Sequence, residues 1–167
     1  MTQSFTIRPA RTSDVPAIKA LVAPLADQRI LMAKETVAYY EGLQEFRIAE
    51  GVDGAVLGCG ALHIMWEDLA EVRTLATAVQ GRGIGRVLLE QLIEDARRYG
   101  VKRVFCLTFE VQFFARHGFE VMADQSAVDP HIYSELLRSH DEGVAEFLDL
   151  ARVKPNTLGN TRMIRQL

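Results

Sequence analysis

The chain of 167 residues lacks most features that mark nucleic-acid-binding, membrane or secreted proteins. No run of lysine and arginine is longer than two residues, and 22 acidic residues against 19 basic ones give a formal net charge of −3. This balance argues against an obligate nucleic-acid binder. No apolar run approaches the ~20 residues that span a bilayer, and residues 1–10 lack a secretory signal pattern. We therefore expect a soluble, cytoplasmic protein.

Cysteine is also scarce, with Cys59 and Cys106 alone in the chain. Each lies in an apolar, strand-like run, and neither belongs to a C-x-x-C pair or to a Cys/His spacing that would hold a metal ion. We predict two buried free thiols and no metal site. The chain is 49% apolar and long enough to bury one sizeable core, so a single domain covering residues 1–167 is expected.

The most informative stretch is the glycine-rich Gln80-Gly81-Arg82-Gly83-Ile84-Gly85. It lies between a strand-like run, 71–77, and a helix-like run, 86–98. Glycine lacks the Cβ atom that would block a sharp turn or a close ligand. A helix that begins directly afterwards points its free N–H groups and the positive end of its dipole at one place. With Arg82 and Arg86 beside it, the stretch predicts a phosphate or pyrophosphate site.

The spacing of these glycines selects among phosphate ligands. The dinucleotide pattern G-x-G-x-x-G would need glycine at position 86 or 88, where the chain has Arg86 and Leu88. The triphosphate loop G-x-x-x-x-G-K-[ST] is absent too, since no Lys-Ser or Lys-Thr follows these glycines. The pattern that is present, Gln80-x-x-Gly83-x-Gly85 after a strand, resembles the acetyl-coenzyme A (acetyl-CoA) pyrophosphate loop of the GNAT superfamily of N-acetyltransferases.

Hydrophobic periodicity predicts the remaining elements. Expected strands cover residues 4–9, 46–50, 55–65, 71–77 and 103–109, and one more begins at 119. The first expected helix begins near Ser13 and ends at Pro24. Four more cover residues 35–43, 86–98, 110–117 and 129–138. Glycines at 54 and 118 fit a hairpin turn and a helix C-terminus. Residues 144–150 are apolar enough to pack against the core, and 154–162 are polar and rich in turn residues.

The order of these elements is that of the GNAT fold, and the resemblance covers roughly residues 4–122. Several segments are similar, more narrowly, to the acetyltransferase domain of N-acetylglutamate synthases: Ile30-Leu31, Gly58-Cys59-Gly60-Ala61-Leu62, Ala70-Glu71, Leu107-Thr108 and Phe113-Phe114-Ala115-Arg116-His117-Gly118-Phe119. The segment Lys154-Pro155-Asn156-Thr157-Leu158-Gly159-Asn160 resembles the short, single-domain form of that enzyme. The resemblance implies an α/β fold of the α+β type, with a central mixed, mostly antiparallel sheet flanked by helices.

The resemblance also implies an acetyl-CoA-dependent enzyme that acetylates the α-amino group of L-glutamate by direct transfer, the first step of arginine biosynthesis. In such enzymes the strand before the loop bonds the pantetheine arm, which here means the backbone of Leu75, Ala76 and Thr77. The rest of the implied cofactor site is Gln80, Gly81, Arg82, Gly83, Ile84, Gly85, Arg86, Phe113, Phe114 and Arg116. An aromatic pair such as Phe113 and Phe114 is also explained by core packing.

Amide formation needs a base that takes a proton from the amine and a donor that stabilises the oxyanion. The family's base is a carboxylate on the strand before the loop, which matches Glu71. Side chains at 71, 73, 75 and 77 would share one face of a regular strand, so a surface ion pair between Glu71 and Arg73 is the alternative. The oxyanion donor would be a backbone N–H near Leu75. His63 is either a second candidate base or a half-buried strand histidine.

The acid that reprotonates the thiolate is left open by the sequence. Other GNAT enzymes often use a tyrosine four residues before the Gly-Phe pair, where this chain has Phe114. Solvent and Tyr133 are the two alternatives.

A substrate with two carboxylates requires cationic partners when it is buried. Lys34 matches a position where relatives carry arginine, and lysine would act there as a point charge, so glutamine and aspartate stay open as acceptors. Arg73, Thr74 and Arg162 complete the implied substrate site. Lys154 is an alternative to Arg162, and each of these cations is also explained as a solvated charge.

Two other functions are compatible with the sequence. The same chemistry could act on another amine, such as a protein N-terminus, a polyamine or a drug. A non-catalytic regulatory module that binds acyl-CoA is the second. We expect a small-molecule partner and no nucleic-acid or membrane partner, and a homodimer is left open.

Overall fold

The computed structural model describes residues 4–31, 33–122, 129–141, 143–144, 147 and 159–167. Its strands are β1 (Phe5–Pro9), β2 (Phe46–Gly51), β3 (Val56–Trp66), β4 (Leu69–Thr77), β5 (Arg103–Thr108), β6 (Glu120–Val121) and β7 (Thr161–Gln166). Its α-helices are α1 (Val15–Asp27), α2 (Thr36–Glu41), α3 (Ile84–Arg98), α4 (Val111–Arg116) and α5 (Pro130–Leu136). Two short 3₁₀ helices, η1 (Thr12–Asp14) and η2 (Leu43–Glu45), join them.

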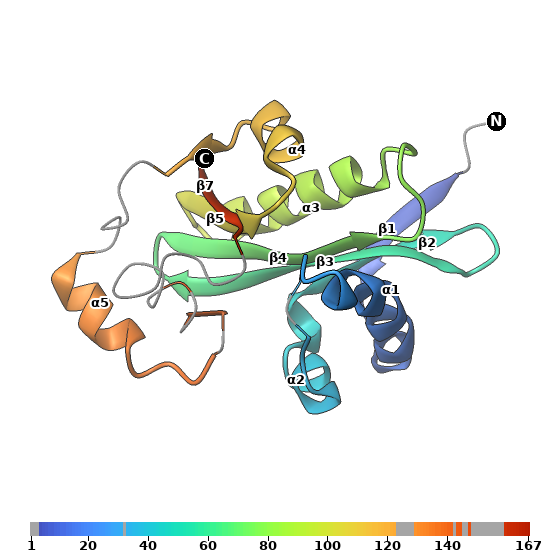
Figure 1. The fold of residues 1–167 in the computed structure, drawn as a ribbon, viewed down its shortest axis with the longest axis horizontal. Coiled ribbons are helices and arrows are strands. Elements are labelled where there is room, and N and C mark those ends of the chain that lie inside the picture. Colours follow the sequence, from blue (N-terminus) through green and yellow to red (C-terminus); the bar gives the residue numbers. More distant parts are fainter. Residues whose placement is uncertain (1–3, 32, 123–128, 142, 145–146, 148–158) are drawn as a thin grey trace.

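The described strands form one sheet in the order β1-β2-β3-β4-β5-β7-β6. All neighbouring pairs are antiparallel except β4 and β5, which are parallel. Helices α3 and α4 cover one face, and α1, α2 and α5 lie on the other side (Figure 1). The mixed, mostly antiparallel sheet flanked by helices confirms the predicted fold class.

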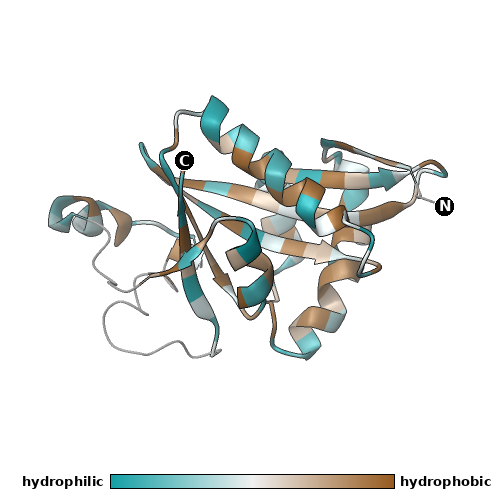
Figure 2. Ribbon diagram, turned by 90° about the horizontal axis from the view of Figure 1, so that it is seen from above, coloured by the Kyte–Doolittle hydropathy of each residue, from teal (hydrophilic) through white to brown (hydrophobic). Residues whose placement is uncertain are grey.

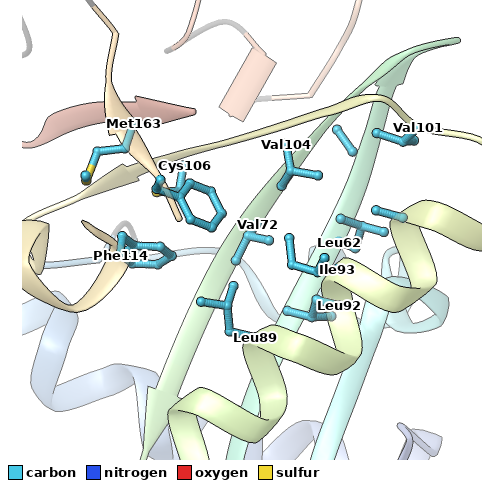
Figure 3. Packing of buried hydrophobic residues seen from close by; sticks show 13 residues of the cluster. Leu62, Val72, Leu89, Leu92, Ile93, Val101, Val104, Cys106, Phe114 and Met163 are labelled. Carbon is cyan, nitrogen blue, oxygen red and sulfur yellow. The ribbon is translucent and has the colours of Figure 1, made fainter. Parts of the chain in front are cut away.

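The long helix α3 is held against the sheet by a continuous apolar layer. Its buried Leu89, Leu92 and Ile93 face Val72 of β4 and Leu62 of β3 (Figure 3). Hydrophilic and hydrophobic residues alternate along the helix in Figure 2, as expected for an amphipathic helix with one solvent face. Truncating one such leucine to alanine typically costs about 2–5 kcal/mol. This layer therefore fixes β4 and α3, the two elements that flank the glycine loop.

Most expected elements are confirmed within a few residues, but the predicted end of the first helix is wrong. Helix α1 continues through Pro24 to Asp27. Proline removes one N–H and crowds the preceding turn, which favours an end there. Leu25 and Ala26, however, pack against the core beneath α1, and this burial favours three more helical residues. Tertiary packing thus outweighs the local preference.

The C-terminal strand β7 was not predicted as a strand. It inserts between β5 and β6, with Arg162 opposite Leu107 and Met163 opposite Cys106. The expected packing of the segment before it is confirmed for the described Val144 and Phe147, which are 1% and 2% exposed and lie in one cluster with Phe105. The polar segment around Lys154 falls outside the described residues.

The two cysteines are buried and free, as predicted. Burial raises the pKa of the Cys59 thiol to about 12 and that of Cys106 well above its ordinary value, so both stay protonated near neutral pH. None of the helices among the described residues is long and apolar enough to cross a membrane. No cluster of three or more His, Cys, Asp or Glu side chains suited to a metal ion occurs in that same part of the chain.

Candidate active site

Strand β4 carries a bulge at Thr74 and Leu75, shortly after Glu71. Cys59 pairs with Ala76 and Ala61 with Arg73, so Thr74 and Leu75 together oppose only Gly60. Thr74 has φ +56°, a left-handed conformation that is rare for a branched residue. A Cβ atom on Gly60 would lie 3.0 Å from side-chain atoms of Leu75 and Leu92, so the glycine permits this close packing.

The bulge reverses the side-chain alternation of β4. Val72 and Leu75, three positions apart, both pack on the α3 side, and Ala76 packs with α1 on the opposite side. The expectation that side chains at 71, 73, 75 and 77 share one face is therefore wrong beyond Arg73. A regular strand would alternate strictly, but the extra residue at the bulge shifts the register by one.

Strands β4 and β5 pair only at their beginnings. Leu69, Ala70 and Glu71 pair with residues 103–105, although β4 continues to Thr77 and β5 to Thr108. Beyond Glu71 the two strands diverge, so backbone groups on this side of β4 have no partner from β5. Such groups need water or a ligand as their partner. Residues 75–77, predicted to bond the pantetheine arm, lie in this diverging part.

The glycine loop has the backbone expected of an anion site. Gly81 and Gly83 have φ of +79° and +73°, and a Cβ on either would meet no atom within 4 Å. Gly83 is the N-cap of α3, and no side chain among the described residues caps the helix. The first N–H groups of α3 are therefore available to an anion, and the predicted Gln80, Arg82 and Arg86 are exposed beside them.

The aromatic pair on α4 divides between the loop and the core. A Cβ on Gly85 would lie 3.6 Å from the Phe113 ring and 3.8 Å from Thr77, so Phe113 and the end of β4 both meet the start of α3. Phe114 is 5% exposed and packs in the core with Phe119, which agrees with core packing as the alternative to a cofactor contact. The side chain of Ile84 is also buried, so only its backbone faces the loop.

A cleft of about 70 Å³ lies at the bulge and contains most of the predicted acceptor residues. It is lined by Ile30, Leu31, Lys34, Glu71, Val72, Arg73, Thr74, Leu107, Gly143 and Asn160. A second, larger hollow of about 390 Å³ adjoins it on the α2 side, because Lys34 and Arg73 line both. The glycine loop lies outside this cleft, further along β4.

Glu71 and Arg73 form the ion pair that the sequence leaves as the alternative, but it is buried rather than on the surface. The Glu71 side chain is 6% exposed, and its Oε2 accepts bonds from Arg73 Nη2 at 2.6 Å and Nε at 3.0 Å. Arg73 also donates to both carboxylate oxygens of Asp141 at 2.9 Å. These two carboxylates raise the pKa of the guanidinium above its ordinary value despite its burial. Four of the five N–H donors of Arg73 are thus engaged by two carboxylates.

His63 lies opposite Glu71 on β3 and belongs to the same group of charges. Its Nδ1 is 2.6 Å from Glu45 Oε1, and its Nε2 is 3.8 Å from Asp141 Oδ2. With carboxylates on both sides, the ring is held in place among these charges. This arrangement favours the half-buried strand histidine over the second candidate base.

Lys34 faces the cleft from the connector between α1 and α2. Burial lowers the pKa of its ammonium and Arg73 lowers it further, while Asp141, Glu71 and Glu45 oppose the shift. Its ammonium has no hydrogen bond or ion pair with any other described residue. Lys34 is therefore placed to receive an anionic group.

Arg162 lies on the same face of the sheet, next to Leu107, but does not line the cleft. Its guanidinium lies 4.5 Å over the Phe147 ring, and burial lowers its pKa. Within the described chain, its Nε and Nη1 are buried without a hydrogen-bond partner. Tyr133 packs against the apolar cluster of Phe147, and Arg116 is exposed at the end of α4.

Asp141, Gly143 and Asn160 were missed by the sequence reasoning. Each comes from the C-terminal third, outside the segment that resembles the GNAT fold most clearly. Asn160 ends the tail segment that resembles the short enzyme form, but that resemblance gave it no role, and no local motif points to Asp141 or Gly143. The packing of Val144 and the insertion of β7 bring all three to β4.

Comparisons with known proteins agree on one family. The acetyltransferase (GNAT) family model matches residues 25–119. An amino-acid acetyltransferase of Mycobacterium tuberculosis is 52% identical over 162 residues, which cover 95% of this chain and 92% of that protein. An amino-acid acetyltransferase of Neisseria meningitidis is 36% identical over 71% of this chain, but the match spans only 28% of that longer protein.

Solved structures agree with these matches. A Mycobacterium tuberculosis protein in complex with CoA and a second ligand superposes with a TM-score of 0.90 at 52% identity, covering 97% of this chain and 99% of that one. N-acetylglutamate synthase from Neisseria gonorrhoeae, complexed with coenzyme A and N-acetyl-glutamate, gives a TM-score of 0.76 at 28% identity, covering 98% of this chain and 35% of that one. The chain therefore belongs to the acetyltransferase (GNAT) family.

Proposed function

We propose that this N-acetyltransferase transfers the acetyl group of acetyl-CoA to the α-amino group of L-glutamate. Acetyl-CoA is the co-substrate, in line with the family and with the CoA-bound relatives. The amino-acid acetyltransferase relatives support an amino acid as the acceptor. The observation that carries the choice of glutamate is the cleft itself, where the carboxylate of Glu71 and the ammonium of Lys34 line the same small space.

In this proposal the cofactor lies along β4, from the glycine loop to the bulge. The free N–H groups at the start of α3, together with Arg82 and Arg86, hold the pyrophosphate. The diverging edge of β4 at residues 75–77 bonds the pantetheine arm. From Thr77 to Glu71 the strand covers about 20 Å at ~3.3 Å per residue, so an extended arm carries the thioester toward the bulge.

Glu71 acts as the base in the proposed reaction. Its carboxylate takes a proton from the acceptor ammonium, directly or through one water, and the neutral nitrogen then forms the bond to the thioester carbon. A backbone N–H at the bulge near Leu75 stabilises the oxyanion. As the carbon–sulfur bond breaks and the amide forms, the nitrogen releases its second proton to solvent, and the departing thiolate takes its proton from solvent.

Lys34 binds a carboxylate of the acceptor in this proposal. Arg73 lines the same cleft, but Glu71 and Asp141 already occupy four of its five donors, and their two negative charges outweigh its single positive one. A carboxylate that enters the cleft therefore meets Lys34 as the available cation. Arg162 lies outside the cleft lining, with its guanidinium over the Phe147 ring and two nitrogens unpartnered among the described residues, and is proposed for the second carboxylate.

Steady-state assays with acetyl-CoA and a panel of acceptors test the proposal. The panel is glutamate, glutamine, aspartate, a polyamine and a peptide with a free N-terminus. We expect the highest kcat/KM with glutamate, because glutamine, the polyamine and the peptide do not offer an α-amino group with two carboxylates for Lys34 and Arg162, and the side chain of aspartate is one methylene shorter. A glutamate kcat/KM below that of any other acceptor would overturn the choice of substrate. No turnover with any of these amines would overturn the proposed reaction.

A further inference from the structure

Asp141 bonds Arg73 across 68 positions of the chain. Its Oδ2 accepts from Arg73 Nη1 at 2.9 Å, and its Oδ1 accepts from Nη2 at 2.9 Å. This parallel, two-bond geometry is the strongest and most directional form of a carboxylate–guanidinium pair. Asp141 therefore fixes the plane of the guanidinium, not only its charge.

The same guanidinium holds Glu71 on its other edge. Nε and Nη2 both donate to Glu71 Oε2, at 3.0 Å and 2.6 Å. A planar group anchored along two edges cannot rotate without breaking bonds on both. With one anchor removed, Arg73 would be free to turn toward the larger hollow that it also lines. The orientation of Glu71 thus depends on a residue that it does not touch.

Asp141 is itself held by its own segment. Its Oδ1 accepts from the backbone N–H of Val144 at 3.0 Å, and its own N–H donates to Ser139 Oγ at 3.2 Å. Val144 is 1% exposed and packs in the cluster of Phe105. Gly143 lies against the guanidinium, since a Cβ there would be 2.7 Å from Nη2 and 2.9 Å from Cζ of Arg73. Side chain and backbone together clamp Arg73.

We propose that Asp141 is a positioning residue that acts through Arg73 to hold the carboxylate of Glu71 where it can take the acceptor proton. This inference rests on the proposed function, in which Glu71 is the base. It makes the packing of the segment around Asp141 a requirement for turnover. A base displaced by about 1 Å can lose as much as 10²-fold in rate, so the effect falls on kcat.

The substitution Asp141→Asn tests the proposal because it keeps the size of the side chain and removes its charge. We expect kcat to fall about tenfold while the KM for acetyl-CoA stays within about twofold. Gly143→Ala is a second variant that keeps the Asp141 carboxylate but disturbs the pair sterically, because the new Cβ would lie 2.7 Å from Arg73 Nη2 and 3.1 Å from Asp141 Oδ1. It is expected to lower kcat in the same way.

Asp95→Asn is the matched control. Asp95 also accepts two bonds from one guanidinium, from Arg47 Nε at 2.6 Å and Nη2 at 2.9 Å, and it lies on α3 away from the cleft. This variant should lower the Tm and leave kcat unchanged. A wild-type kcat in Asp141→Asn, or an equal loss of kcat in Asp95→Asn, would overturn the role of Asp141.

A crystal structure of Asp141→Asn separates this inference from the proposed acceptor. We expect Arg73 and the Glu71 carboxylate to leave their present positions in the variant. If both keep their bonds, the positioning role is wrong, whatever the acceptor is. Wild-type protein that fails to acetylate glutamate would instead contradict the proposed substrate and leave the outcome of the structural test standing.

Discussion

The two halves of the proposed site differ in how the chain builds them. Most of the cofactor half is one continuous stretch, from Leu75 at the end of β4 through the glycine loop to Arg86 in α3, and Phe113 of α4 lies beside it. The acceptor half combines Lys34, Glu71 and Asp141, which come from a connector, a strand and the C-terminal third. The first half depends on local backbone geometry and the second on long-range packing. Variants should therefore separate cofactor binding from acceptor chemistry.

The largest expected effect is on the acceptor half. Glu71→Gln removes the proposed base and should lower kcat by about 10²-fold or more, with acetyl-CoA affinity unchanged. Glu50→Gln is the control, because Glu50 forms an ion pair with Arg8 at 2.6 Å outside the cleft. Steady-state kinetics and calorimetric titration with acetyl-CoA measure both quantities. A Glu71→Gln variant with wild-type kcat would remove Glu71 from the mechanism.

The next effect falls on the cofactor half alone. Gly83→Val puts a branched side chain where the anion is expected, and acetyl-CoA should bind at least about tenfold more weakly. Gly100→Val is matched to it, since Gly100 has φ +84°, lies at the other end of α3 and also has nothing within 4 Å of a Cβ. Both variants carry the same backbone strain, so thermal unfolding should show similar losses. Equal acetyl-CoA affinity in the two would contradict the loop as the anion site.

Lys34→Ala should affect the acceptor half without affecting the cofactor half. We expect the KM for glutamate to rise about tenfold and the KM for acetyl-CoA to change less than about twofold. Lys102→Ala, which removes an exposed lysine just before β5, is the control. Similar changes in both KM values would show that Lys34 does not bind the acceptor.

The pH dependence of acceptor binding sharpens the same point. Burial lowers the pKa of Lys34, so its ammonium loses its proton at a lower pH than an ordinary lysine with a pKa of ~10.4. As the pH rises through the lowered pKa, the KM for glutamate should increase. Lys34→Arg keeps its charge throughout and should move this increase to higher pH. A KM profile identical in the two proteins would assign the titration to another group.

The smallest effect is expected at the bulge that joins the two halves. Thr74→Gly relieves a left-handed conformation that costs a branched residue about 1–2 kcal/mol, but glycine adds about 0.5–1 kcal/mol of entropy cost. The free energy of unfolding should therefore change by less than about 1 kcal/mol, and kcat by less than about twofold. Denaturant titration measures the first quantity. A loss of several kcal/mol would show that the threonine side chain, and not the backbone, maintains the bulge.

The sequence predicts the part of the fold that depends on neighbouring residues. Glycines at 54, 83 and 118 do adopt the left-handed or turn conformations expected of them, and the strand–loop–helix unit around Gly83 forms as predicted. Helix α1 passes Pro24 because packing of Leu25 outweighs a local preference. A short window contains no information on such packing, which explains this error.

The unpredicted features all depend on contacts between distant segments. The bulge at Thr74 appears only when β3 and β4 are paired, and it reverses the alternation that a regular strand would have. Strand β7 reaches its place between β5 and β6 from the end of the chain. Asp141 is an ordinary polar residue in sequence, and only the burial of Val144 brings it to Arg73. The acceptor half could therefore be predicted only in outline.

A crystal structure with coenzyme A and glutamate bound tests most directly whether the two halves meet at Glu71. We predict the pyrophosphate at the start of α3, the acceptor nitrogen within hydrogen-bond reach of the Glu71 carboxylate, directly or through one water, and an acceptor carboxylate on Lys34. A glutamate bound elsewhere, or one whose amino group points away from Glu71, would contradict the account.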